Sequence, residues 1–443
     1  MPSALAPSEA THSEATPSAL ISRGLGRSYG DAAQIEGGTI LDATALRAIG
    51  PIHVSDEHAT IDVGAGVSLG DLARRVAAQG WLPPVLPGTR HVTVGGAIAA
   101  DVHGKDHHQR GGFGRTVASF SLVTAEGLQR PVSREDDRGL FEATVGGMGL
   151  TGVITSARLE VERLPSGVVE VETARTRDLH ETMARLTEGD QDHRYSVAWI
   201  DLATPAHRGR GVVQLGNLAL PLGGPLELDE AQRRPRYQPG RALPVPRVPG
   251  RRGTVRTPIV RSFNLAYWRR PRKRHALVPL PSFFHPLDAL AGWPRLYGAS
   301  GFLQYQCVLP DGQESVLAAL AEAFANGPAT PALAVLKRLG AQGEGMLSFP
   351  LEGWTLAVDL PVDDAETYLM LDHVDEVVAE AGGRVYLAKD ARLRPDVLAA
   401  MYPRLAEWRA VKERVDPEGR FRSDLAERLG LVPPRGTRAT PGA

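Results

Sequence analysis

The sequence predicts an α+β protein of two domains, and three observations support this. A chain of 443 residues is too long for one simple core. Residues 21–164 are rich in glycine and in short β-type runs, whereas residues 165–383 alternate longer helical stretches with strands. The order of elements lacks the regular strand–helix alternation that predicts a doubly wound sheet.

Both ends of the chain are expected to be disordered tails. Residues 1–20 and 432–443 consist mostly of small residues, Pro and charged groups, and they offer little to bury. The first stretch also lacks the basic start and apolar run of a secretory signal. No apolar run approaches the roughly 20 residues that a membrane-spanning helix needs. We therefore expect a cytoplasmic protein whose contact with a membrane, if any, is peripheral.

The first domain is expected to contain four strand segments and two helices. The strands correspond to GGTILDAT, ATIDVGAGVS, VASFSLVTAEG and GVITSARLEVERL. Residues 69–79 have apolar side chains at helical spacing and stop at Gly80, which favours a helix, and residues 136–145 favour a second one.

The second domain and the C-terminal segment are expected to be richer in helix. Residues 315–325 and 365–381 are predicted helices, and GFLQYQCVLP and WTLAVDLPV are predicted strands. The C-terminal segment contains one predicted helix, MYPRLAEWRAVKERVDP. Residues 233–275 carry fourteen Arg or Lys, no acid and several prolines, so we expect a solvated, mobile loop without a core.

Composition excludes several classes of chemistry. Fifty basic and 51 acidic residues give a net charge of -1, so no overall field attracts nucleic acid or lipid. The single cysteine, Cys307, excludes an intramolecular disulfide, a Cys-ligated zinc and an iron–sulfur cluster, and its strand context indicates a buried apolar residue. Asp101, His103, His107 and His108 resemble a metal cluster, but the glycines around them favour a loop and we predict no metal. Redox chemistry would need a bound organic cofactor.

Two glycine motifs superficially match the dinucleotide fingerprint. Residues 147–152, GMGLTG, have its letters, but a helix precedes them and a strand follows, which is the reverse of what the fingerprint needs. A tight turn is the better interpretation. RGLGRSYGD at 23–31 has Tyr29 where the third glycine belongs. The sequence does not support a Rossmann-type NAD site.

Two other glycine clusters suit an anionic pyrophosphate. They are residues 23–31 and the stretch from Pro87 to Lys105, whose backbone N–H groups can form nests. Ser28, Thr89 and Thr93 add hydroxyl donors. Each cluster alone is weak and ordinary turns would explain it, but the pair in one β-rich domain is specific.

These clusters resemble a known flavoprotein family, and further motifs along the chain share the resemblance. They are VLPGTRHVTVGGAIAADVHGKDHH, ATVGGMGLTGVI, FHPLD, GFLQYQ, VYLAKD and MYPRLAEW. The family is the vanillyl-alcohol-oxidase/PCMH-type superfamily, and the motifs are most similar to the decaprenylphosphoryl-β-D-ribose 2'-oxidases. The resemblance implies a PCMH-type FAD-binding domain at 21–165, completed by residues 384–431. Between them it implies a substrate domain at 166–383, built on an antiparallel sheet.

The resemblance also implies which residues contact FAD. The pyrophosphate and ribityl contacts would be Gly24, Gly26, Arg27, Ser28, Tyr29, Gly88, Thr89, Thr93, Gly95 and Gly96. The wall of the isoalloxazine site would be formed by His103, Gly104, Gly149, Ile154 and Tyr386. Many relatives in the superfamily attach flavin covalently through a histidine at the position of Arg27. Arginine cannot form that bond, so we expect non-covalent FAD.

The chemistry needs a C–H aimed at flavin N5, a proton acceptor, and positive charge near the reduced flavin. The resemblance places Lys389 at the centre, either as a base or, by slight preference, as a cation that stabilises reduced flavin. Tyr29, His103, Lys105, Gln306 and Lys337 are the other catalytic candidates. The implied substrate contacts are Trp199, Lys105, Gln306 and Lys337. Without the family, each would be an ordinary surface or core residue, and Trp199 a core residue.

The implied reaction is oxidation of the 2'-hydroxyl of a polyprenyl-phosphoryl ribose to the 2'-keto sugar, by hydride transfer to flavin N5. This is the first half of epimerisation to the arabinose donor of cell-wall arabinan, which a separate NAD-dependent short-chain reductase would complete. The basic loop could cover the phosphate or touch an anionic membrane, with Tyr267 and Trp268 at the interface, or have no ligand at all. Ala357 and Thr355 replace a cysteine and an asparagine of well-known members, which places substrate recognition in doubt.

Two other functions remain open. An aldonolactone or alditol oxidase acting on a free sugar would share the C-terminal helix and the glycine loops, although Arg27 and the FHPLD, GFLQYQ and AKD motifs argue against it. A nucleic-acid-binding protein could use residues 233–275, but the balanced charge and the flavin motifs make it remote, and we expect no nucleic-acid partner.

Overall fold

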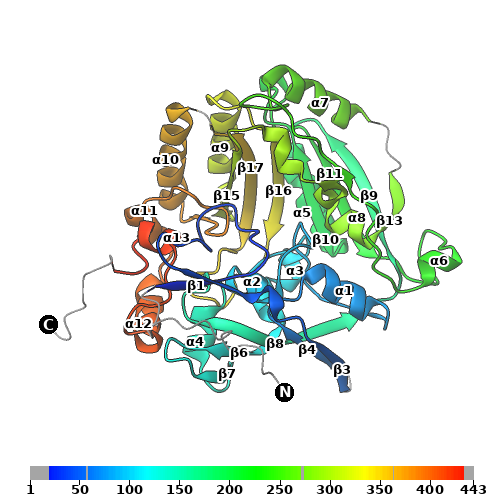
Figure 1. Ribbon diagram of the computed structural model, residues 1–443. Coiled ribbons are helices and arrows are strands. Elements are labelled where there is room, and N and C mark those ends of the chain that lie inside the picture. Colours follow the sequence, from blue (N-terminus) through cyan, green and yellow to red (C-terminus); the bar gives the residue numbers. More distant parts are fainter. Residues whose placement is uncertain (1–18, 56–57, 271–273, 363, 434–443) are drawn as a thin grey trace.

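The computed structural model describes residues 19–55, 58–270, 274–362 and 364–433. They form two large antiparallel sheets, one above the other in Figure 1, with helices packed on both, and two small parallel sheets of two strands each. This confirms the predicted α+β class. The described residues contain no helix with the length and apolar character required to cross a bilayer. The predicted N-terminal tail lies outside the described residues, except for Ala19 and Leu20, as does most of the C-terminal one.

The lower sheet has the strand order β3-β4-β8-β6-β7, with β5 paired to β8. Its strands are β3 (Ile49–Ser55), β4 (His58–Gly64), β5 (Trp81–Leu82), β6 (Val117–Val123), β7 (Gln129–Ser133) and β8 (Val153–Arg163). Alternate residues point into the core, as Ile61 opposite Leu159 shows, because successive side chains leave opposite faces of a strand. We call this part, up to Leu164, the N-terminal domain.

Short helices cover the core face of the lower sheet. They are α1 (Leu69–Ala77), α2 (Val94–Ala99), α3 (His107–Arg110) and α4 (Arg138–Thr144). Ser68 caps α1 by accepting a hydrogen bond from the N–H of Asp71, and Gly80 follows with a φ of +79°. The predicted helices at 69–79 and 136–145 are thus confirmed with shorter ends. The predicted loop around His107 and His108 is wrong, because these residues form α3.

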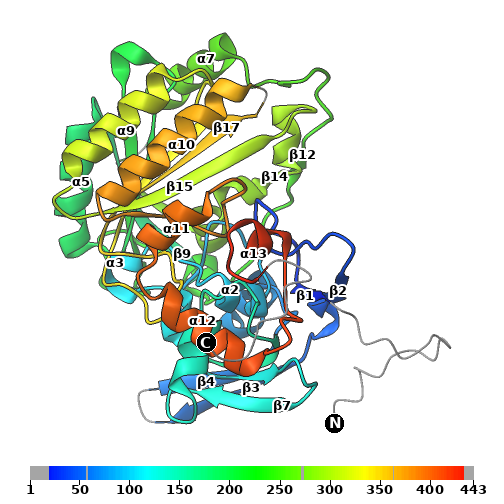
Figure 2. The ribbon, with the colours of Figure 1, turned by 90° about the vertical axis from the view of Figure 1, so that its left-hand side faces the viewer.

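The upper sheet has eight strands in the order β13-β9-β11-β10-β16-β17-β15-β18. They are β9 (Val168–Thr176), β10 (Tyr195–Ile200), β11 (Gly211–Leu218), β13 (His275–Pro279), β15 (Phe302–Pro310), β16 (Leu333–Leu339), β17 (Gly353–Pro361) and β18 (Arg384–Val385). Helices α5 (Leu179–Asp192), α9 (Glu314–Asn326) and α10 (Ala365–Glu380) cover one face of it (Figure 2). The predicted strands at 301–310 and 354–362 and helices at 315–325 and 365–381 are confirmed.

The C-terminal segment returns to the N-terminal domain. Its helices are α11 (Pro395–Met401), α12 (Leu405–Val415) and α13 (Asp424–Arg428). Trp408 of α12 is fully buried and donates from Nε1 to the Ala143 carbonyl of α4 at 3.0 Å. The predicted single helix at 401–417 is wrong at its start, because Pro403 cannot continue α11. The segment also begins with β18, which pairs with β15 of the upper sheet.

Residues 233–275 differ most from expectation. The prediction of a loop without a core is wrong here, because the stretch contains strand β12 (Leu243–Pro244) and the helix α7 (Thr257–Arg269). Val255 and Val260 are buried together with Tyr297 and Ala203, which gives the helix a small apolar core of its own. The high density of basic residues did not indicate this helix, because only a few apolar residues at helical spacing are needed to dock one amphipathic helix. Residues 271–273 lie outside the described part.

The remaining elements are short. The strands are β1 (Leu20–Arg23), β2 (Thr39–Asp42) and β14 (Leu290–Ala291), and the helices are α6 (Glu230–Arg233) and α8 (Leu280–Phe284). β1 pairs in parallel with β2 and also touches the C-terminal segment, where the Leu20 N–H donates to the Arg420 carbonyl at 2.8 Å. The two ends of the described chain are therefore joined in one domain.

Candidate active site

The face of the upper sheet opposite α5, α9 and α10 carries the predicted polar residues. Lys337 on β16 lies opposite Thr355 on β17, and Ala357 lies opposite Gln306 on β15. Cross-strand neighbours point to the same face of a sheet. The alternate residues, such as Cys307, are buried on the helical side, which confirms Cys307 as a buried thiol. Because successive side chains along each strand point to opposite faces, the upper sheet has one polar face, which carries the site, and one apolar face.

Three lysines contribute to this face, from three different segments. Lys105 follows the glycine stretch of the N-terminal domain, Lys337 lies on β16, and Lys389 follows β18. The Lys337 Nζ donates to the Gly104 carbonyl at 3.4 Å, which joins two of these segments. Desolvation, with repulsion from Lys337, lowers the pKa of Lys105 and of Lys389 to about 7 each. Desolvation lowers that of Lys337 to about 8.

The choice of lysine is informative in this chain. Of its 50 basic residues only five are lysines, and three of these five lie in the site. Arginine keeps its proton in essentially any environment, whereas a desolvated lysine can lose it near neutral pH. A site that needs cations of adjustable charge requires lysine rather than the arginine used elsewhere in the protein.

Lys389 is held against Tyr29. Its Nζ lies 3.5 Å from the centroid of the Tyr29 ring, a distance typical of a cation–π contact. The Tyr29 N–H donates to the Ala388 carbonyl at 2.9 Å, so the loop at 23–31 and the VYLAKD motif are directly bonded. Arg428 of α13 ties both ends together by pairing with Asp31 at 2.7 Å and with Asp390 at 2.9 Å.

His103 is buried and neutral beside Gln306. The Gln306 Nε2 donates to the His103 Nε2 at 3.1 Å, which leaves the ring proton on Nδ1. Desolvation, with repulsion from Lys337, His107 and Lys389, holds the His103 pKa well below its ordinary value. Its Nδ1 is buried and has no partner among the described residues. The ring packs against Tyr386, whose hydroxyl donates to the Ala100 carbonyl at 2.9 Å.

The segment 283–288, which is Phe283 followed by the FHPLD motif, joins the lysine site to the loop at 87–90. Lys105 donates to the Phe283 carbonyl, and its Nζ lies 4.1 Å from the centroid of the Phe283 ring. Asp288 accepts from the Thr89 hydroxyl and from the Arg90 N–H, both at 2.8 Å. The Thr89 hydroxyl is thus engaged with protein, and it organises the loop rather than standing free.

The glycine clusters at 23–31 and 87–105 pack against each other in the N-terminal domain, and we call this region the cradle. Thr93 caps α2 by accepting from the Gly96 N–H at 3.2 Å, and the Gly95 N–H donates to the Ala65 carbonyl. A Cβ on Gly24 would lie 2.3 Å from the Thr93 Oγ1, so the loop at 23–31 packs directly on this cap. The N–H groups of residues 24–28, which include Gly26, Arg27 and Ser28, form no hydrogen bond with the described chain.

This cradle fits the pyrophosphate of FAD that the resemblance implies. Free N–H groups at 24–28 offer donors to an anion. A Cβ on Gly88 would meet nothing within 4 Å, so that side of the loop is open. The donor Nδ1 of His103 is one of several buried polar atoms without a partner among the described residues. The donors of α2 itself are already satisfied, so the cradle depends on the loop at 23–31 more than on the helix terminus.

The glycine turn at 146–152 supports the same region. It connects α4 to β8, as the reversed order of elements predicted, and Gly149 has a φ of +79°. The Met148 N–H donates to the Ala99 carbonyl at 2.9 Å, so the turn rests on the end of α2. The Ile154 side chain is buried in the core of the N-terminal domain, which leaves only its backbone for a ligand.

Trp199 lies in the same sheet row as the site. It is opposite Val335 on β16, which in turn is opposite Ala357. The Trp199 side chain is only half-buried, and its ring contacts Tyr267 of α7 edge-on at 4.8 Å between centroids. The core position expected from the residues alone is therefore wrong, because α7 covers the tryptophan only in part, and the substrate contact implied by the resemblance stays a prediction.

The histidines near His103 have other partners. His107 Nδ1 accepts from the Gly340 N–H at 3.0 Å, and the His108 ring lies 3.5 Å from Asp190. Asp101 accepts from the Gly114 N–H at 2.8 Å. In the described ranges, no three His, Cys, Asp or Glu side chains gather as metal ligands would.

Sequence reasoning missed one carboxylate of the site. Asp359 of β17 is fully buried and accepts from the Tyr297 hydroxyl at 2.8 Å and from the Gln304 Nε2 at 2.5 Å. Burial raises its pKa to about 6, and its charge raises the pKa of Lys389. The sequence contained one signal for this residue, which is an acid inside the apolar strand WTLAVDLP. A buried charge requires a partner, so such an acid indicates a polar site.

Comparisons with known proteins identify the family of the chain. A family model described as FAD binding domain matches residues 12–133, and one for D-arabinono-1,4-lactone oxidase matches residues 356–429. The chain is 39% identical over 418 residues to the decaprenylphosphoryl-beta-D-ribose oxidase of Mycolicibacterium smegmatis, which covers 93% of this chain and 89% of that protein.

Two further relatives show the breadth of the group. An uncharacterized protein of Streptomyces coelicolor is 40% identical over 375 residues, 82% of this chain and all of that one. An alditol oxidase from a Streptomyces species is 34% identical over 103 residues, about a quarter of each chain. With an FAD-binding domain of PCMH type and a relative matched along nearly all of its length, the chain belongs to the decaprenylphosphoryl-β-D-ribose oxidase family of FAD-dependent oxidoreductases.

Proposed function

We propose that the enzyme oxidises the 2'-hydroxyl of a polyprenyl-phosphoryl-β-D-ribose to the 2'-keto sugar, the first half of epimerisation to an arabinose donor. The observation that carries this is the group of three desolvated lysines, Lys105, Lys337 and Lys389, on one face of the site. A phosphodiester-linked sugar is an anion that such a group attracts. The match to the mycobacterial oxidase over 93% of this chain supports the same substrate class.

Each side chain has a distinct task in this scheme. FAD, when bound in the cradle, supplies the hydride acceptor. Lys389 holds a positive charge where the acceptor becomes anionic, and Tyr29 fixes its position. Gln306 and His103 share a hydrogen bond and orient the sugar hydroxyls, with the His103 Nδ1 as free donor. Lys105 and Lys337 bind the phosphoryl group, and the proton of the oxidised 2'-hydroxyl passes to solvent water.

The test is anaerobic reduction of the flavin, followed as loss of its yellow absorbance. We expect a polyprenyl-phosphoryl ribose to reduce it and free ribose, an alditol or an aldonolactone to leave it oxidised. Reduction by the free sugars alone would overturn the proposal. It would favour the second candidate, a lactone or alditol oxidase, which is suggested by the match of residues 356–429 to the D-arabinono-1,4-lactone oxidase model.

The keto product also implies a partner. Epimerisation requires that the 2'-carbonyl be reduced by hydride delivered to its other face, which needs a second hydride donor. We propose an NAD-dependent short-chain reductase as the consumer of the product. With oxygen or another electron acceptor present to reoxidise the FAD, mixing both enzymes with the polyprenyl-phosphoryl ribose and NADH should yield the arabinose epimer, whereas either enzyme alone should not.

We further propose that FAD is bound without a covalent bond. Arg27 stands where flavin-linking relatives carry histidine, and its side chain is exposed. Precipitating the holoenzyme with acid should therefore release all of the yellow colour into the supernatant. Colour that stays with the pellet, after washing in denaturant, would contradict the proposal. A histidine-linked flavoprotein treated in parallel provides the control.

Asp359→Asn is expected to shift the pH dependence of flavin reduction to lower pH. The Asp359 carboxylate raises the pKa of Lys389, so its neutralisation lowers that pKa below about 7. If charged Lys389 is the active form, the rate of flavin reduction falls as the pH rises through this pKa. In the variant the rate falls at a lower pH. Stopped-flow rates across neutral pH measure this.

The control for this experiment is Asp192→Asn, which removes an exposed carboxylate on α5. Its profile should match that of the unaltered enzyme. If the rate instead rises with pH through the Lys389 pKa, lysine acts as the base rather than as the cation. An unchanged profile in Asp359→Asn would show that the carboxylate does not control Lys389.

A further inference from the structure

The helix α7 is held on the site face of the upper sheet by one side only. Asn264 Nδ2 donates to the Asp201 Oδ1 at 2.8 Å, and Trp268 Nε1 donates to the Thr176 carbonyl at 3.1 Å. Val260 is buried one turn earlier. These positions, spaced by four residues, define the inner side of the helix. Trp268, expected at a membrane interface, faces protein instead.

A neighbouring side of α7, about 100° around the helix from the docked residues, exposes an apolar stripe. The exposed fraction is 49% for Ile259 and 61% for Phe263, and Phe263 stacks on Tyr267 with 6.0 Å between ring centroids. The three residues are again spaced by four, so they follow one line along the helix. Single exposed apolar residues are ordinary, but an exposed Phe and Ile on consecutive turns of an Arg-flanked helix indicate an interface.

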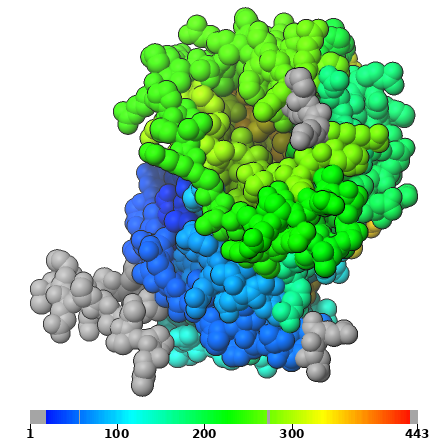
Figure 3. Space-filling model, turned by 90° about the vertical axis from the view of Figure 1, so that its right-hand side faces the viewer, coloured from blue at the N-terminus to red at the C-terminus, as the bar shows by residue number. Residues whose placement is uncertain are grey.

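The stripe leads into the active site. Tyr267 contacts Trp199 at 4.8 Å between ring centroids. Trp199 begins a row of cross-strand neighbours that continues through Val335 and Ala357 to Gln306. An apolar chain attached to a sugar phosphate near Gln306 would follow these side chains outward to α7. In Figure 3 the green segment around α7 borders a hollow, and residues coloured like β17 are visible at its floor.

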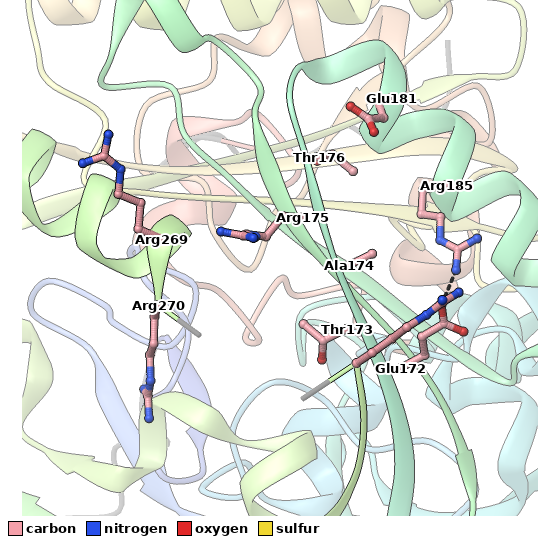
Figure 4. Close-up of a pocket in the computed structure, with 10 residues that line it drawn as sticks. Glu172, Thr173, Ala174, Arg175, Thr176, Glu181, Arg185, Arg269 and Arg270 are labelled. Carbon is pink, nitrogen blue, oxygen red and sulfur yellow. Dashed lines mark hydrogen bonds and ion pairs between the residues drawn. The ribbon is translucent and has the colours of Figure 1, made fainter. Parts of the chain in front are cut away.

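An arginine-rich pocket of about 650 Å³ adjoins the end of α7 (Figure 4). Arg269 and Arg270 extend from the helix and Arg175 from β9, while Arg185 pairs with Glu172 on the opposite wall. Among the described residues, Arg175 and Arg269 have no ion-pair partner. The pocket therefore presents uncompensated positive charge directly beside the apolar stripe.

We propose that α7 and this pocket form a docking face for an anionic lipid bilayer, from which the enzyme takes its substrate. The apolar stripe would enter the boundary of the acyl chains, and the arginines would contact lipid phosphates. A soluble polyanion would use the arginines alone and would leave Ile259 and Phe263 in water. The inference rests on the proposed function, because only a lipid-linked sugar has to be collected from a membrane.

The test is flotation of the full-length holoenzyme with vesicles of phosphatidylcholine, with and without phosphatidylglycerol. We expect binding to the anionic vesicles and at least tenfold weaker binding to the neutral ones. Ile259→Ser/Phe263→Ser and Arg175→Glu/Arg269→Glu should each weaken binding to anionic vesicles about tenfold or more. Leu222→Ser, which alters a side chain 77% exposed elsewhere, and Arg75→Glu on α1 are the matched controls and should bind normally.

A second measurement separates docking from catalysis. Flavin reduction is followed with a short-chain, water-soluble phosphoryl ribose and with the long-chain substrate in anionic vesicles. The α7 variants should be slowed about tenfold with the vesicle substrate and be unaffected with the soluble one. The unchanged rate with the soluble substrate also shows that the variants are folded and hold FAD.

Three outcomes would overturn the docking face. The first is failure of the unaltered enzyme to bind anionic vesicles, and the second is equal binding by the α7 variants and the controls. The third is equally tight binding to a soluble polyanion such as heparin that survives loss of Ile259 and Phe263. If instead neither substrate reduces the flavin while binding still depends on α7, the proposed substrate is wrong and the docking face stands.

Discussion

Replacing Lys389 by methionine is expected to slow flavin reduction by about 10²–10³-fold, the usual cost of removing one preorganised charge from a transition state. Methionine fills a similar volume without a cation. Desolvation already lowers the pKa of Lys389 to about 7, so the site has free energy to gain from losing the charge. The variant should therefore fold and bind FAD normally. Thermal unfolding and flavin content measure this beside the rate.

Lys389→Arg distinguishes the two roles that sequence reasoning left open. Arginine keeps its proton near neutral pH, so it can stabilise negative charge but cannot act as a base. If Lys389 is a cation, the arginine variant should retain clearly more activity than the methionine variant. Equal loss in both would favour the base. A methionine variant as fast as the unaltered enzyme would exclude Lys389 from the chemistry altogether.

Helices and strands with a strong apolar periodicity could be predicted from the sequence, whereas the elements that pack against them could not. The helix at 69–79 followed from apolar spacing and a glycine stop, and α1 is found there. The helix α7 was missed because fourteen basic residues dominate its surroundings, although Val260, Asn264 and Trp268 share one side. Local composition reports what a segment exposes, but the few contacts that dock it depend on tertiary neighbours such as Asp201.

The site shows the same division. Lys105, Lys337 and Lys389 lie far apart in the sequence, and only the resemblance to a family singled them out. The sheet register explains why they meet, since it places Lys337 beside Thr355 and Gln306 beside Ala357. Asp359 could have been recognised from the sequence as an acid in an apolar strand. Its effect on the pKa of Lys389 could not be predicted, because that effect depends on which loop packs over the strand.

The loop at 23–31 depends on a close approach that no sequence pattern predicts. Gly30 has an ordinary backbone conformation, so its φ does not require glycine. A Cβ at this position, however, would lie 1.9 Å from the Asp390 carbonyl oxygen and 3.2 Å from the Ala391 Cα. Backbone atoms cannot rotate away as a side chain can. Only glycine lets this loop reach the segment that carries Lys389.

Gly30→Ala is therefore expected to separate Tyr29 from Lys389 and to slow flavin reduction about 10²-fold, the cost of misplacing a catalytic group by roughly 1 Å. Overpacking should also cost about 1–3 kcal/mol of stability. Gly240→Ala is the matched control, because its added Cβ meets nothing within 4 Å. Reduction rates and thermal unfolding of both variants measure the effect. Normal behaviour of Gly30→Ala would mean that the loops can part without disturbing Lys389, so that the contact with Tyr29 does not fix its position.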